Sequence, residues 1–169
     1  SWAPVGDVIG YFARTEKSKT LILQNVASGK IQTRIDLKAV DAPESPAFSP
    51  DGARVAFSAL QDGVGDIWVV DVVTGDLTNL TKDAFADFSP TFSPDGKTLV
   101  YTARISGNDK LFQLDLATGQ KKQLTFGTHD DTAAKLLEIE PILSQYGVHI
   151  AFQGHNHFYE RMNTVNDVT

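Results

Sequence analysis

Two histidines near the carboxyl end are the residues of this sequence best suited to metal chemistry. His155 and His157 lie two positions apart in "GHNH", directly after the apolar run "VHIAF" at 148–152. Imidazole nitrogen is a common ligand for transition metals such as zinc and iron. The 169 residues include no cysteine, so a metal site here must be built from His, Asp, Glu, Asn and backbone oxygen. The pair marks a metal site that needs further ligands.

The rest of the chain offers few candidates for these further ligands. His129, Asp130 and Asp131 in "LTFGTHDD" could approach the two histidines in space, although the same stretch also fits the ordinary end of a repeat unit. Asn108 and Asp109 fall in a predicted hairpin loop. We expect those two residues to be structural.

A repeat organises most of the chain. "SPAFSPDGARVAFSA" begins at Ser45 and "SPTFSPDGKTLVYTA" begins at Ser89, and the two copies stay in register without a gap. Each copy reads as four short strands with alternating apolar residues, separated by Asp-Gly and Thr-Gly turns. A period of 44 residues with this pattern is typical of a β-propeller blade.

The repeated aspartates are predicted to serve the architecture. Asp51 and Asp95 stand in Pro-Asp-Gly turns, while Asp71 and Asp115 stand at strand ends. At such places a carboxylate accepts hydrogen bonds from nearby backbone N–H groups. Because these aspartates recur at the blade spacing, we interpret them as structural residues and not as ligands or catalysts.

The two full copies, with their Phe-Ser-Pro-Asp-Gly turns and closing Leu-Thr, resemble the TolB-type propeller repeat. A weaker copy precedes them, with Ser28-Gly29 at the place of the Thr-Gly turn and no Ser-Pro-Asp-Gly signature. The resemblance predicts an all-β fold: a partial propeller of four-stranded blades in residues 1–131. Such propellers are mostly interaction platforms or substrate-gating domains, and the resemblance implies a periplasmic or secreted protein. The predicted blades cover about residues 5–44, 45–88 and 89–131.

The last segment, 132–169, departs from the repeat. Its sequence predicts a short amphipathic helix within about 132–146, followed by a strand and a loop and strand around the two histidines. With its Tyr146-Gly147-Val148, its Gly-His-Asn-His and its Tyr159-Glu160-Arg161, the segment resembles the last metal motif of the purple acid phosphatases, a branch of the calcineurin-like metallophosphoesterases.

The resemblance implies that His155 and His157 are ligands of a two-metal centre holding Fe, Zn or Mn, which would hydrolyse phosphate monoesters. That family draws its other ligands from upstream motifs, and this chain has no Gly-Asn-His. Its nearest match to the Gly-Asp motif, "GDVIGYF", has Tyr11 one residue out of place. An alternative stays open, since Gly147 aligns with Gly96 of the repeat and the tail could fold as an irregular fourth blade.

Composition narrows the classes of function. The net charge of −6 argues against a nucleic-acid surface. No apolar run is long enough to span a membrane. The sequence contains no charged-then-apolar signal-peptide pattern and begins at Ser1, as we expect of a mature or trimmed product. The leading prediction is a β-propeller binding or scaffold module without an intact catalytic centre. It would bind a protein partner or self-associate through open propeller faces, and the alternative is the metal-dependent phosphoesterase.

Overall fold

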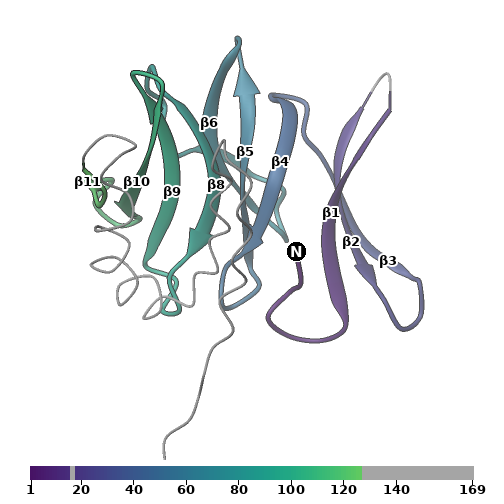
Figure 1. Ribbon diagram of the computed structural model, residues 1–169. Coiled ribbons are helices and arrows are strands. Elements are labelled where there is room, and N and C mark those ends of the chain that lie inside the picture. Colours follow the sequence, from purple (N-terminus) through teal and green to yellow (C-terminus); the bar gives the residue numbers. More distant parts are fainter. Residues whose placement is uncertain (16–17, 127–169) are drawn as a thin grey trace, which may run out of the picture.

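The computed structural model describes residues 1–15 and 18–126, and within these residues the regular structure is entirely β-strand (Figure 1). The strands form three antiparallel sheets, which we call blades 1, 2 and 3. Blade 1 holds β1 (Val8–Arg14), β2 (Lys19–Asn25) and β3 (Ile31–Asp36). Blade 2 holds β4 (Asp41–Phe48), β5 (Arg54–Gln61), β6 (Val64–Asp71) and β7 (Leu77–Asn79). Blade 3 holds β8 (Ala86–Phe92), β9 (Thr98–Ile105), β10 (Asn108–Asp115) and β11 (Lys121–Gln123).

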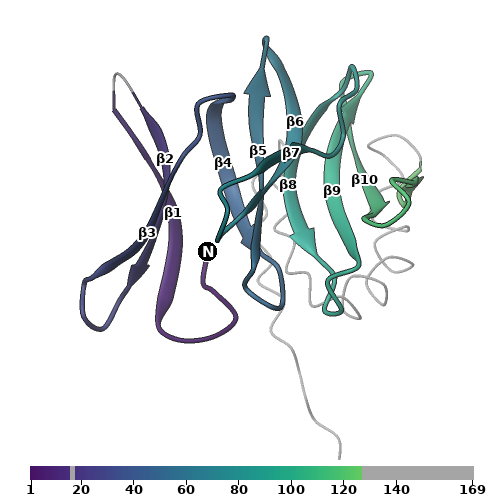
Figure 2. The same ribbon diagram turned by 180° about the vertical axis from the view of Figure 1, so that it is seen from behind.

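These sheets confirm the predicted all-β fold and its partial propeller of TolB-like blades. Seen from behind, the three sheets stand side by side in chain order (Figure 2). The helix predicted within 132–146 and the strand predicted at 148–152 lie outside the described residues. No helix in the described part of the chain is long and apolar enough to cross a membrane.

Blades 2 and 3 repeat the same backbone. Phe57 pairs with Trp68 in blade 2, and Tyr101 pairs with Phe112 in blade 3, each 44 residues further along. Left-handed backbone conformations recur at the same interval. These are Ser45 and Ser89 (φ 52° and 55°), Asp62 and Ser106 (53° and 50°), Gly63 and Gly107 (85° and 80°), and Gly75 and Gly119 (77° and 71°). The consecutive positive φ angles at Asp62-Gly63 and Ser106-Gly107 are those of two-residue type I′ hairpins, which match the twist of the flanking strands.

The first strand of each full blade begins before the predicted blade boundary. The division placed between residues 44 and 45 falls inside β4, and the division between 88 and 89 falls inside β8. We call β4 and β8 the leading strands of blades 2 and 3. Their early residues hold equivalent places in the two sheets although most of them differ, as Pro43 and Asp87 do.

Blade 1 differs because no full leading strand precedes β1 in the described residues. Residues 1–3 lie where the last residues of the leading strand lie in blades 2 and 3. Ser1 and Gly10 exchange two backbone hydrogen bonds, with N···O distances of 3.0 and 2.8 Å, and Trp2 bridges to Ile9. In blade 2, Ala47 and Phe48 pair with β5 in the equivalent way. The register is therefore shifted by 46 residues between blades 1 and 2.

This register shows that residues 3–6 of blade 1 form the equivalent of the Ser-Pro-Asp-Gly turn, although their sequence is Ala-Pro-Val-Gly. Pro4 and Gly6 stand where Pro50 and Gly52 stand in blade 2, and Gly6 has the same left-handed φ of 75°. The serine and aspartate of the signature are replaced by Ala3 and Val5. The turn survives in blade 1 without the side-chain hydrogen bonds that accompany it elsewhere.

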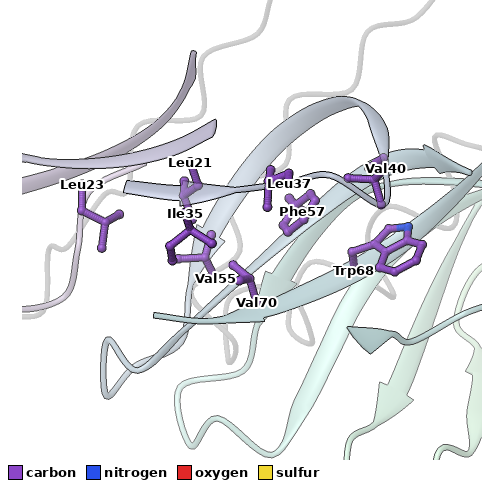
Figure 3. Packing of buried hydrophobic residues seen from close by; sticks show 10 residues of the cluster. Leu21, Leu23, Ile35, Leu37, Val40, Val55, Phe57, Trp68 and Val70 are labelled. Carbon is purple, nitrogen blue, oxygen red and sulfur yellow. The ribbon is translucent and has the colours of Figure 1, made fainter. Parts of the chain in front are cut away.

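Apolar side chains fill both junctions between the blades. In the first junction the rings of Phe12 and Phe57 lie 5.2 Å apart, centroid to centroid. Burial of this kind is the main source of stability for sheets packed face to face. The first cluster comprises Leu21, Leu23, Ile35, Leu37, Val40, Val55, Phe57, Ala59, Trp68 and Val70 (Figure 3). The second comprises Ala56, Ile67, Phe92, Leu99, Tyr101, Ala103 and Leu114.

Candidate interaction surface

The predicted metal ligands lie outside the part of the chain that the structure describes. This applies to His155 and His157 and to the nearby candidates His129, Asp130 and Asp131. Among residues 1–15 and 18–126, no group of three or more His, Cys, Asp or Glu side chains is arranged to hold a metal ion. The carboxylates of the described residues instead make the hydrogen bonds and ion pairs given below.

The aspartates of the Pro-Asp-Gly turns are structural, as predicted. Asp51 Oδ1 lies 2.5 Å from Ser49 Oγ and accepts the backbone N–H of Ala53 at 3.0 Å. The hydrogen bond from Ser49 is the largest cause that lowers the Asp51 pKa. Asp95 repeats this arrangement with Ser93 at 2.6 Å and Lys97 at 3.0 Å.

The aspartates at the strand ends have the predicted role as well. Asp71 Oδ1 accepts the backbone N–H groups of Val73 and Thr74, both at 2.8 Å, and these bonds hold the Asp71 pKa below its ordinary value, with the Thr74 bond contributing most. Asp115 binds the equivalent N–H groups of blade 3. In blade 1, Asn25 takes the same position and accepts the N–H of Ser28 at 2.8 Å.

Asp109 also has a structural partner. Arg104 Nε and Nη2 donate to its two carboxylate oxygens at 2.7 and 3.1 Å, across the hairpin between β9 and β10. The two side chains are about half exposed, so this bidentate ion pair contributes little to stability. Asn108 and Asp109 lie in β10 and not in the hairpin loop, where they were predicted, because Ser106 and Gly107 alone form the turn. The ion pair agrees with the predicted structural use of Asp109.

Asp87 is the exception among these carboxylates, and sequence reasoning missed it. Its side chain lies near the start of β8 with 2 % of its surface exposed, and in the part of the chain that the structure describes neither carboxylate oxygen has a hydrogen-bond partner within bonding distance. Burial raises its pKa to about 7. The available signal was a departure from the repeat, because Pro43 occupies this position in blade 2.

The groups around Asp87 are mostly acidic. Asp66 accepts hydrogen bonds from Asn79 at 2.7 Å and Thr81 at 3.2 Å. Lys121 Nζ donates to the Thr81 carbonyl and to Asp83, both at 2.6 Å. The ammonium of Lys121 is thus already paired with Asp83. Among the described residues, burial therefore raises the Asp87 pKa more than Lys121 lowers it.

Blade 1 has a face that no blade covers within the described residues. Gly10 and Phe12 contact blade 2, and side chains alternate along a strand, so Ile9 and Tyr11 lie on the opposite face. Both are partly exposed, and Tyr11 Oη donates to Gln24 Oε1 at 2.9 Å. At the equivalent positions the preceding blade buries the side chain, with exposed fractions of 0 % for Val55, Phe57 and Leu99 and 2 % for Tyr101.

Comparison with known proteins agrees with this architecture. The model of the TolB beta propeller domain matches residues 1–163. The chain belongs to the TolB beta propeller domain family. The match includes residues 132–163, most of the segment for which a resemblance to purple acid phosphatases was predicted.

Solved propeller structures resemble the chain in fold. TolB from Acinetobacter baumannii has 28% sequence identity and a TM-score of 0.63 over 74% of this chain and 31% of its own. A putative TolB from Agrobacterium tumefaciens has 22% identity and a TM-score of 0.63 over 73% and 47%. The AtxE2 isopeptidase has 15% identity and a TM-score of 0.60 over 79% and 29%. The chain therefore spans less than half of each of these proteins.

Proposed function

We propose that this protein is a β-propeller binding module that associates with protein partners, including further copies of itself, through the open face of blade 1. The observation that carries the proposal is the contrast between that face and its two internal equivalents. Ile9 and Tyr11 are partly exposed, whereas Val55 and Phe57 are fully buried by a preceding blade. A blade buries its faces against neighbours in repeat architectures, so a second sheet is the natural cover for this surface.

The use of the polar residues supports a binding role over a catalytic one. In the described residues the repeated aspartates are bound to turn N–H and hydroxyl groups, and the hairpin aspartate is bound to an arginine. We propose that the protein acts in the periplasm or after secretion, as its family resemblance suggests.

The metal-dependent phosphoesterase is the second candidate, and the Gly-His-Asn-His motif is the feature that favours it. Fe, Zn or Mn bound by His155 and His157 would supply a metal-activated hydroxide. The extent of the TolB match, to residue 163, supports reading the same segment as part of the propeller. For the binding module we propose a boundary between residues 131 and 132. The segment after this boundary would form an irregular fourth blade.

Light scattering on dilution tests self-association. We expect a mass above 18.4 kDa at micromolar concentration, and a loss of association in Ile9→Lys, which places a charge on the open face. Val73→Lys is the matched control, because Val73 is 88 % exposed in a turn of blade 2. A species of constant 18.4 kDa on dilution, for both variants and the parent, would contradict self-association.

Metal analysis and an aryl phosphate assay test the second candidate. We expect no turnover with added Zn, Mn or Fe. Turnover that disappears in both His155→Ala and His157→Ala would replace the binding module with the phosphoesterase.

A further inference from the structure

We propose that a cavity between blades 1 and 2 binds the guanidinium group of an arginine side chain carried by a different protein. The choice of a protein as the source of the arginine rests on the proposed binding function, for which the inference names a site and a chemistry. The cavity lies at the junction of the two blades, on the side of blade 1 that is opposite to Ile9 and Tyr11.

The size of the cavity suits a single long side chain. Its volume is about 250 Å³, which is below the roughly 300–1,000 Å³ of pockets for drug-sized ligands. Apolar side chains of both blades form most of its wall, and polar groups are supplied by Gln32, Thr33 and Asp51. A ligand with an apolar stem and a polar, charged end matches such a wall.

Arg54 occupies the equivalent place between blades 2 and 3. Its guanidinium carbon lies 5.4 Å from the centroid of the Phe92 ring. Its Nη2 also donates to the carbonyl oxygen of Gly96 at 3.3 Å. An arginine over an aromatic face is attracted by the ring quadrupole. The second junction therefore shows how this fold holds a guanidinium between the end of β8 and the turn that follows it.

Blade 2 presents the same ring and the same carbonyl to blade 1. Phe48 and Gly52 both line the cavity. They stand 44 residues before Phe92 and Gly96 and hold the equivalent places. Only 7 % of Phe92 is exposed, whereas Phe48 is partly buried. The Gly52 carbonyl accepts no hydrogen bond from the described residues. Both groups that contact a guanidinium in the second junction can thus do so in the first.

Val8 is the residue that leaves this place empty. In the 46-residue register between blades 1 and 2, Val8 takes the position of Arg54, and each residue begins its strand. Val8 shares the face of β1 that carries Gly10, because side chains alternate along a strand, and it lines the cavity. A valine side chain is too short to reach the ring and the carbonyl together. An arginine from another protein would supply both contacts.

The charge around the cavity favours a cation. Asp51 contributes a carboxylate to the wall, and none of the described Lys, Arg or His residues lines it. The hydrogen bond from Ser49, followed by that from the Ala53 N–H, lowers the pKa of Asp51, so this carboxylate is ionised at neutral pH. The net charge of the chain is −6, which attracts a basic segment over a longer range.

Acetylarginine amide is a direct probe, because its blocked ends imitate an arginine within a chain. An NMR titration of the full chain should give saturable shifts of the Val8 and Gly52 amide signals, with a Kd on the order of 1–10 mM. Acetylcitrulline amide has nearly the same shape without the charge, and acetyllysine amide with a free ε-ammonium has the charge without the planar group. Each should bind at least about fivefold more weakly.

Three variants test the site from the protein side. Val8→Arg should fill the cavity as Arg54 fills its own place, and should weaken binding of the probe at least about tenfold. Phe48→Leu removes the aromatic face and should weaken binding about fivefold. Arg54→Val is the matched variant, since it opens the equivalent place in the second junction. It should add a second site, seen as shifts of the Gly96 amide signal, and it keeps the test open if Val8→Arg does not fold.

Several outcomes would overturn the proposal: no saturation by about 50 mM probe, equal binding of the citrulline compound, undiminished binding by folded Val8→Arg, or no second site in Arg54→Val. Free arginine that binds about tenfold more tightly than the blocked probe would assign the cavity to the amino acid and overturn the protein assignment. A fall in the mass of an oligomer on addition of the probe would assign the arginine to a second copy of the chain, with the same consequence.

The self-association proposed above can fail independently of this site. Ile9→Lys should bind the probe as the parent does, because Ile9 lies on the opposite face of β1. Retained probe binding without self-association would leave this inference standing and remove only the self-association. Self-association without probe binding would remove only this inference.

Discussion

Gly10 of blade 1 lies directly against the ring of Phe48 in blade 2. A methyl group on Gly10 would sit 2.9 Å from both Phe48 Cε2 and Cζ and 3.2 Å from Leu23 Cδ2. These distances are shorter than van der Waals contact, so the close approach of the two blades depends on the absence of a side chain at this position.

We therefore expect Gly10→Ala to destabilise the junction between blades 1 and 2 by about 1–3 kcal/mol, the usual cost of overpacking. Urea unfolding measures this change. The double variant Gly10→Ala with Phe48→Leu should recover part of the loss, because leucine is shorter than the ring it replaces. Equal destabilisation in the single and double variants would show that the contact with Phe48 is not the cause.

Ser93 carries three hydrogen bonds of the turn in blade 3. Its Oγ lies 2.6 Å from Asp95 Oδ1 and 3.1 Å from the carbonyl of Thr98, and it accepts the N–H of Thr98 at 3.0 Å. Ser93 is 1% exposed, so Ser93→Ala should lower the free energy of unfolding by about 1–3 kcal/mol. Ser28→Ala, in an exposed turn, is the control and should cost less than about 1 kcal/mol. Similar losses in both variants would contradict the importance of the buried hydroxyl.

The sequence contains the information for the repeat, because the turn residues and the alternating apolar residues occupy fixed places in it. The predicted roles of Asp51, Asp71 and their copies follow from the same regularity, since each must satisfy the N–H groups of a turn that recurs. The start of the leading strands could not be predicted in this way. Asp41 and Glu44 pair with β5 through backbone groups, and such pairing does not depend on the side chain. Blade 3 therefore keeps the same pairing with Ala86 and Phe88 at the equivalent places.

The features that were missed depend on contacts between distant parts of the chain. The turn at Pro4 and Gly6 is defined by the pairing of Ser1 with Gly10, which the sequence does not reveal. Asp87 stands at the aligned position of Pro43, but its burial depends on the packing of blade 3 against blade 2. The histidine pair remains a prediction from its motif alone.

The hydrogen bonds of the Asp71 carboxylate should make the stability of the fold depend on pH in the acidic range. Hydrogen bonds from Thr74 and Val73 lower its pKa in the folded state. A lowered folded pKa contributes stability that is present above the unfolded value of 3.8 and is lost as the pH falls through the folded pKa. Asp71→Asn should therefore lower the midpoint of thermal unfolding at pH 7, and the difference from the parent should shrink below pH 4. A difference that stays constant between pH 7 and pH 3 would contradict this role.

Asp87 should give the opposite dependence on pH. Its folded pKa of about 7 lies above the ordinary value of 3.8, mainly because of burial, so the unfolded chain releases this proton more readily than the folded one. The stabilising contribution of the protonated form is complete below pH 3.8 and is lost as the pH rises through about 7.

Asp87→Asn has a neutral side chain of nearly the same shape at every pH. Compared with the parent, we expect it to be more stable by about 4 kcal/mol at pH 8 and by only about 1 kcal/mol at pH 4.5. Urea unfolding at these two pH values measures the difference, with Asp71→Asn as the control whose effect has the opposite sign. An Asp87→Asn variant that is less stable than the parent at pH 8 would mean that the ionised carboxylate has a stabilising partner at the junction of blades 2 and 3.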